Sequence, residues 1–102
     1  MKKYEVIVTD LAKKDIKNIH SYMSNELFLP NEALNLVKLI EKNIKDLEVM
    51  PERFRKYEKY KDKNIRICRV KKYLIFYNIN DDENQVEVVR ILYSARNYDA
   101  IL

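Results

Sequence analysis

Four arginines in this sequence have the side-chain type and placement to bind phosphate or carboxylate groups: Arg66, Arg69, Arg90 and Arg96. They lie on or next to stretches rich in Val, Ile, Leu and Tyr, where strands are expected. A guanidinium presents a planar fork of donors that fits either anion, so the group predicts a surface for RNA, DNA or an acidic peptide. The alternative is that these arginines are edge-strand charges, which protect a sheet from aggregation.

Two tyrosines flank the last of these arginines. Tyr93 and Tyr98 lie on either side of Arg96, and a tyrosine beside an arginine can stack on a base or transfer a proton. We therefore treat both as candidate functional residues. Tyr73 and Tyr77 fall on one face of a predicted strand together with aliphatic residues, and we expect them in the core or at its edge.

The residue types that the chain lacks exclude several kinds of site. It has no glycine, and phosphate-cradling loops, dinucleotide fingerprints and nucleophile elbows all need glycine at fixed places. His20 and Cys68 are the single residues of their types, so a disulfide, a multi-cysteine zinc site and a Ser-His-Asp triad are not expected. We predict no cofactor and no metal, with His20 and Cys68 in structural roles.

The positive charge of the chain is concentrated in its middle. The net charge is +4, but ten lysines and arginines face three acidic residues between Glu52 and Lys72. Such a block suits a polyanion or an acidic protein partner, although a solvated lysine-rich loop has the same composition. No apolar run is long enough to cross a bilayer and the first residues are not a signal peptide, so we expect a cytoplasmic protein without a membrane partner.

Apolar periodicity predicts the elements that must position these residues. A strand over 3–8 precedes a helix that Thr9 or Asp10 caps, and Asn31 caps a second helix. Three further strands are expected at 65–70, 73–79 and 86–92. Asn and Asp residues in the link between the last two strands supply the turn geometry that glycine usually provides.

This order of elements, β-α-α-β-β-β, predicts a single α+β domain over residues 1–102. In it a helical hairpin packs on a mainly antiparallel four-stranded sheet. Because side chains alternate along a strand, regular pairing would put Arg66 and Arg69 on opposite faces of that sheet.

Four segments carry a resemblance to a known family. YEVIVTDLAKKDIKNIHSYMSNEL and PNEALNLVKLIEKNIKDLEVMPERF look like a helical hairpin, and IRICRVKKYLIFYNI and VEVVRILYSARNY look like the three strands and the tail that follow it. Together they resemble the toxins of the RelE/ParE superfamily over nearly the whole chain. The most specific parts are KKYLIFY and VVRILYSARNY, and the predicted order of elements is that of the superfamily.

The resemblance implies the toxin of a type II toxin–antitoxin system, a kind of system associated with plasmid stabilisation. A co-encoded antitoxin would neutralise it in a heteromeric complex, with an acidic, initially flexible segment that folds over the toxin and suits the basic block. The resemblance also implies one of two targets. The RelE branch is an mRNA interferase that cleaves mRNA on the ribosome without a metal, whereas the ParE branch inhibits DNA gyrase by binding.

The departures from the family pattern favour the ParE branch. Nuclease relatives often carry an arginine just before the penultimate-strand motif, where this chain has Leu74, and its C-terminus at 100–102 is apolar. Arg96 matches the arginine after the last strand, and Tyr93 stands where many relatives have histidine. RNA cleavage needs a proton acceptor, a proton donor and charge at the phosphorane, and this set is incomplete. We therefore predict a binding inhibitor of gyrase that is not an enzyme.

Two alternatives remain open from the sequence. The first is a ribosome-dependent mRNA endonuclease, in which Tyr93 and Arg96 would be the catalytic residues. The second is an inactive relative that retains only antitoxin binding. The predicted binding residues are Arg66, Arg69, Arg90, Arg96 and Tyr98.

Overall fold

The computed structural model describes residues 2–57 and 64–94 of the chain, so the candidate residues Arg96 and Tyr98 lie outside the described residues. Its main elements are β1 (Glu5–Val8), α1 (Asp10–Ser21), α2 (Pro30–Lys45), β2 (Arg66–Val70), β3 (Tyr73–Asn80) and β4 (Gln85–Tyr93). A short π-helix, η1 (Tyr22–Glu26), extends α1, and two 3-10 turns, η2 (Asp46–Glu48) and η3 (Pro51–Arg53), follow α2.

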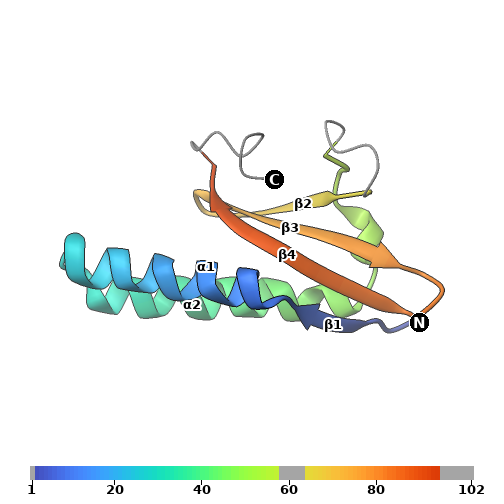
Figure 1. The fold of residues 1–102 in the computed structure, drawn as a ribbon, viewed down its shortest axis with the longest axis horizontal. Helices are drawn as coiled ribbons and strands as arrows, with labels where there is room; N and C mark the ends of the chain where they lie inside the picture. The colour runs from blue at the N-terminus through green and yellow to red at the C-terminus, as the bar shows by residue number, and fades with distance from the viewer. Residues whose placement is uncertain (1, 58–63, 95–102) are drawn as a thin grey trace.

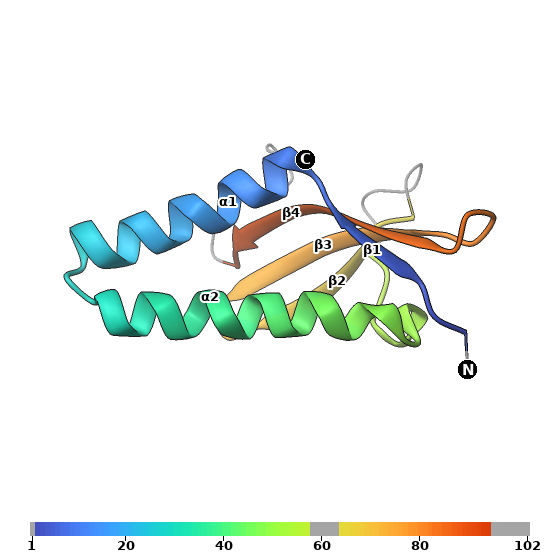
Figure 2. The ribbon, with the colours of Figure 1, turned by 90° about the horizontal axis from the view of Figure 1, so that it is seen from below.

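The four strands form one mixed sheet in the order β1-β4-β3-β2. β1 pairs with β4 in parallel, and the other two pairings are antiparallel. The two helices run antiparallel to each other along one face of the sheet, as Figure 1 and Figure 2 show. The α+β fold predicted from the sequence is therefore confirmed. No helix in the described part of the chain is long and apolar enough to cross a membrane.

The two helices begin for different reasons. Thr9 caps α1 as predicted, because its Oγ1 accepts the amide of Ala12 at 3.1 Å. The prediction that Asn31 caps the second helix is wrong: α2 already begins at Pro30, and Leu29 is its N-cap residue. Proline suits the first helical position, since its φ is preset and the missing amide would have had no intrahelical partner there.

The turns of the sheet are built without glycine. Asn84 closes the β3–β4 turn at φ 53° and Lys71 lies in the β2–β3 turn at φ 56°. Asparagine tolerates this left-handed region, as the sequence predicted, but lysine has no side-chain device that favours it.

Lys71→Gly is therefore expected to raise the free energy of unfolding by up to about 1 kcal/mol. Glycine has no Cβ and avoids the energetic cost of the left-handed region, but it loses more chain entropy on folding, which offsets part of the gain. Chemical denaturation measures the change. Lys72→Gly is the matched control, since Lys72 has no positive φ, and it should lower the free energy of unfolding. Equal effects of the two substitutions would contradict the assignment of strain to Lys71.

The main core lies between the helices and the sheet. Its fully or nearly buried members include Ala12, Ile40, Ile44, Leu47, Cys68, Val70, Ile75, Tyr77, Val86, Val88 and Ile91. Tyr77 is in the core as predicted, and its hydroxyl donates to the Pro51 carbonyl at 2.5 Å. Cys68 is a buried small residue, as the sequence indicated, and burial raises the pKa of its thiol.

A β-bulge at Val89 changes the face to which the second half of β4 points. β4 has one more residue than β3 at this place in the pairing. Val88 and Ile91 are three residues apart and would point to opposite faces of a regular strand, yet both are in the helix-side core. The bulge therefore sets which side chains of the last strand face the helices.

Candidate functional site

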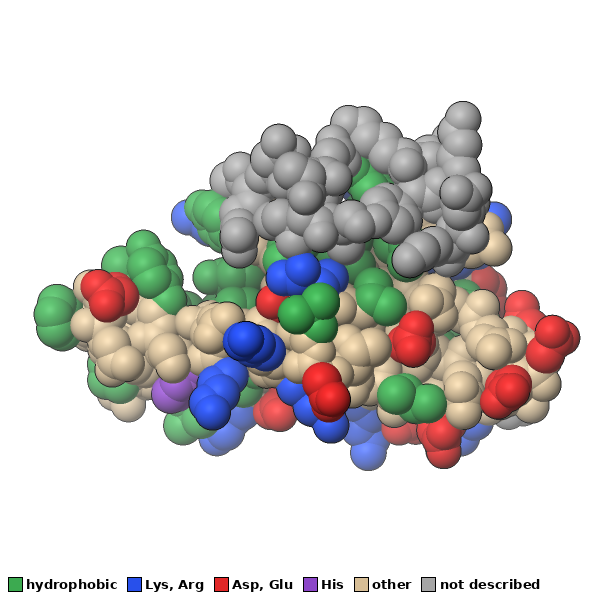
Figure 3. Space-filling model, viewed as in Figure 1, with side chains coloured by type: hydrophobic (Ala, Val, Ile, Leu, Met, Phe, Trp, Pro, Cys, Tyr) green, Lys and Arg blue, Asp and Glu red, His purple; other side chains and the backbone are tan. Residues whose placement is uncertain are grey.

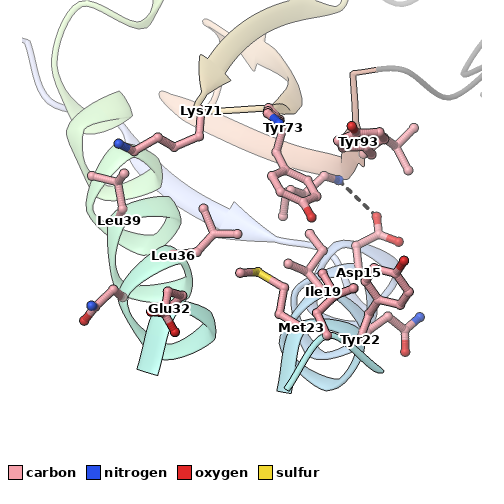
Figure 4. Close-up of a pocket in the computed structure, with 16 residues that line it drawn as sticks. Asp15, Ile19, Tyr22, Met23, Glu32, Leu36, Leu39, Lys71, Tyr73 and Tyr93 are labelled. Atoms are coloured by element: carbon pink, nitrogen blue, oxygen red, sulfur yellow. Dashed lines mark hydrogen bonds between the residues drawn. The ribbon is translucent and has the colours of Figure 1, made fainter. Parts of the chain in front are cut away.

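The helical hairpin is longer than the sheet it packs against, and its far end projects beyond the strands (Figure 1). Figure 3 shows hydrophobic side chains gathered on this projecting end. Between it and the ends of β3 and β4 lies an open groove of about 1200 Å³. Its apolar lining includes Ile19, Met23, Leu36 and Leu39 (Figure 4). Ile19, Leu36 and Leu39 also pack against the core and are only partly buried, so the apolar stripes of the hairpin extend from the core into the groove.

The apolar surface continues over the tip of the hairpin. Tyr22, Leu27 and Phe28 are between 45% and 81% exposed, with Phe28 the most exposed. Phe28 also takes φ 55°, a strained value for a bulky residue, and the Leu27 amide closes a π-type turn on the Tyr22 carbonyl at 3.2 Å. Contiguous exposed apolar side chains mark interaction sites on small domains. The groove and the tip together form the candidate interaction surface.

Asp15, one of the residues that line the groove, forms a largely buried ion pair with Arg90. The Arg90 guanidinium donates from Nε and from its second terminal nitrogen to the two carboxylate oxygens of Asp15, at 2.7 and 2.9 Å. The Ile91 amide donates to the same carboxylate at 3.0 Å. The two side chains are 16% and 10% exposed, and the hydrogen bonds to Asp15 raise the pKa of Arg90. This bidentate pair fixes α1 to β4.

Tyrosines surround the sheet end of the groove. The rings of Tyr73 and Tyr93 meet edge to face with centroids 5.6 Å apart. Burial first, and then the neighbouring Tyr93 and Tyr22 phenols, raise the pKa of Tyr73. Its hydroxyl therefore stays protonated and can donate a hydrogen bond to a ligand in the groove. Tyr93 is 39% exposed, which leaves it accessible to a partner.

The family of the chain follows from its comparison with known proteins. Residues 6–98 match the family model described as the ParE toxin of the type II toxin–antitoxin system, parDE. The chain belongs to the ParE toxin family. The predicted resemblance to RelE/ParE superfamily toxins is thereby confirmed, and the groove and its ion pair lie within the matched residues.

Solved structures share the fold of this ParE-family chain. The chromosomal ParDE system from P. aeruginosa aligns with a TM-score of 0.75 and 16% identity, over 91% of this chain and 98% of that one. The toxin–antitoxin complex RelBE2 from Mycobacterium tuberculosis aligns with a TM-score of 0.65 and 24% identity, over 94% of this chain and 97% of that one. The RelE–RelB complex from Pyrococcus horikoshii OT3 aligns with a TM-score of 0.64 and 17% identity, over 94% of this chain and 99% of that one. A search of curated protein sequences finds no match.

The structure separates the arginines that the sequence grouped as binding residues. Arg90 of this ParE-family chain is held in the ion pair with Asp15. Arg66 donates to the main-chain carbonyls of Glu52 and Phe54 at 2.9 and 2.6 Å, which ties the segment after α2 to β2. Arg69 is exposed on the opposite face of the sheet, as the alternation predicted. The three candidate arginines that the structure describes therefore do not form one cluster.

The opposite face of the sheet is apolar where the nuclease branch was expected to place an arginine. Leu74 is 4% exposed and lies in a second buried cluster with Ile67, Phe76 and Leu92. Toward the other end of the strands this face becomes polar, with Asn78 donating to Glu87 at 3.2 Å. Among the described residues no group of three or more His, Cys, Asp or Glu side chains could hold a metal.

Sequence reasoning missed the groove and Asp15. Asp15 lies in the apolar stripe of α1, beside Ala12 and Ile16, and an acidic residue in such a stripe needs a buried partner. Arg90 lies in the middle of an apolar strand, and a basic residue there likewise needs a buried partner. The groove itself left no local signal, because it depends on how far the hairpin extends past the sheet.

Proposed function

We propose that this toxin acts by binding DNA gyrase and inhibiting it, and that it does not cleave RNA itself. The ParE family model and the ParDE neighbour support this target. The observation that carries the proposal is the engagement of Arg90 by Asp15. An arginine whose guanidinium is used in a largely buried, bidentate ion pair is not available to neutralise a phosphorane.

Two other described positions support the same conclusion. Arg66 is occupied by two main-chain carbonyls, and the position of the expected catalytic arginine is the buried Leu74. Metal-free cleavage of RNA needs a base, an acid and a cation within hydrogen-bond reach of one phosphate. A binding inhibitor needs only a complementary surface, and the exposed apolar tip of the hairpin provides one.

The supercoiling activity of purified gyrase tests this proposal. Excess toxin is expected to abolish supercoiling, and prior addition of the co-encoded antitoxin is expected to restore it. Tyr93→Phe should inhibit as strongly as the unmodified toxin, because no proton transfer is involved. Undiminished supercoiling at saturating toxin would overturn the gyrase proposal.

A second candidate is a ribosome-dependent mRNA endonuclease, favoured by one observation. Tyr93 is exposed at the end of β4, two positions before the tail segment that contains Arg96, so its hydroxyl is accessible to a substrate. This candidate predicts cleavage of mRNA on translating ribosomes, and loss of cleavage in Tyr93→Phe. If the toxin neither cleaves mRNA nor inhibits gyrase and does not slow growth, the chain retains only antitoxin binding.

We also propose that the groove is the docking site for a helical segment of the antitoxin. Two of the solved structures that share this fold are complexes, the toxin–antitoxin complex RelBE2 and the RelE–RelB complex. An open groove with a mainly apolar lining suits an amphipathic helix, which inserts side chains spaced by three and four residues. The basic block suggested by the sequence then adds attraction for an acidic partner, and the salt dependence of antitoxin binding measures that contribution.

A further inference from the structure

The charged side chains that line the groove are segregated at its two ends. Lys71 and Lys72, in the β2–β3 turn, lie at the sheet end, and Glu32, in the first turn of α2, lies at the hairpin end. Figure 4 shows Lys71 and Glu32 at opposite ends of the lining. All three are exposed and none forms an ion pair within the described part of the chain.

The remaining charges of the lining do not disturb this arrangement. Asp15 is neutralised by Arg90, and the polar residues Asn18 and Asn35 carry no charge. The apolar side chains of the hairpin fill the space between the ends, so a ligand meets a positive end, an apolar middle and a negative end. A helix bound in the reverse direction would meet like charges at both ends.

We propose that the groove selects its antitoxin helix by charge order: acidic residues lie against Lys71 and Lys72, and a basic residue lies against Glu32. This inference rests on the docking of an antitoxin helix in the groove. Apolar anchors supply the affinity, because exposed ion pairs are each worth only about two- to fivefold in binding. Three such pairs together change the dissociation constant by about tenfold to a hundredfold, which is enough to fix one orientation and to reject antitoxins with the opposite charge order.

The experiment uses the full toxin and its co-encoded antitoxin, with the dissociation constant measured at low and at physiological salt. Lys71→Glu/Lys72→Glu is expected to weaken binding about tenfold or more. Lys13→Glu/Lys14→Glu is the matched control, since it changes the net charge equally at exposed positions of α1 that do not line the groove. Equal weakening by the two double variants would overturn the proposal, because the effect would then come from total charge.

The sign of the Glu32→Lys effect is the sharper test. If the antitoxin has a basic residue at this end, the Glu32→Lys toxin binds it about two- to fivefold more weakly than the unmodified toxin does. If the antitoxin is uniformly acidic, the variant binds it more tightly. Tighter binding would therefore overturn the charge order. Glu41→Lys, at an exposed position of α2 outside the groove lining, is its control.

The failure of the charge order is distinguishable from failure of the docking site. If an acidic side chain in the middle of the groove, as in Met23→Asp, leaves the dissociation constant unchanged, the antitoxin does not dock there at all. If Met23→Asp abolishes binding while the charge variants match their controls, the groove is occupied but does not select by charge.

Discussion

Asp15→Asn is expected to lower the free energy of unfolding by about 3–5 kcal/mol, because it leaves the Arg90 guanidinium buried without its counter-charge. Both side chains are largely buried, and the carboxylate also accepts the amide of Ile91. Domains of this size have a total stability of roughly 5–15 kcal/mol, so one substitution would remove a large share of it. Urea denaturation followed by circular dichroism measures the loss.

Two further variants test whether the pair itself is the cause. Asp10→Asn changes an exposed acidic residue in the first turn of the same helix, and should cost no more than about 1 kcal/mol through the helix dipole. Asp15→Leu/Arg90→Met removes both charges and should recover most of the lost stability, because a well-packed apolar pair often replaces a buried ion pair without loss. Asparagine keeps an oxygen that can accept the Ile91 amide, so a double variant as unstable as Asp15→Asn would contradict the assignment of the loss to the unpaired charge.

The same pair shows how far the sequence could lead. The helices and strands were predictable because each has its own apolar period, and Thr9, Asn84 and the buried Tyr77 behave as their local patterns indicate. Arg90 was grouped with the other arginines because its partner is 75 residues away in the chain. Only the packing of α1 on β4 shows that these two residues meet.

The face of a residue in β4 was likewise not predictable from alternation. The bulge at Val89 reverses the pattern, so the second half of the strand points to the faces opposite to those a regular strand would give. The groove is a third case. Its lining residues read as ordinary core positions of amphipathic helices, because a sequence pattern cannot indicate that the sheet ends before the helices do.

Leu36→Asp is expected to weaken antitoxin binding by at least about a hundredfold. Leu36 lines the groove at its centre and is only partly buried by its own chain. A docked apolar helix would bury the rest of it, which is worth part of the roughly 1.5–3 kcal/mol for a whole side chain, and a carboxylate at this position would additionally be desolvated without a partner. Calorimetric titration of the toxin with the antitoxin measures the effect.

Leu34→Asp is the matched control for this prediction. Leu34 is on the same helix and is 47% exposed, but it does not line the groove, so the same substitution should change the dissociation constant only a few-fold. Because Leu36 also contacts the core, Met23→Asp serves as the second groove variant, and thermal unfolding identifies any variant that binds weakly because it is unfolded.

In cells that express the antitoxin, a folded groove variant should escape neutralisation and arrest growth, whereas Leu34→Asp should remain controlled. Neutralisation of both groove variants at normal antitoxin levels would contradict docking in the groove and move the antitoxin site to another face of the toxin.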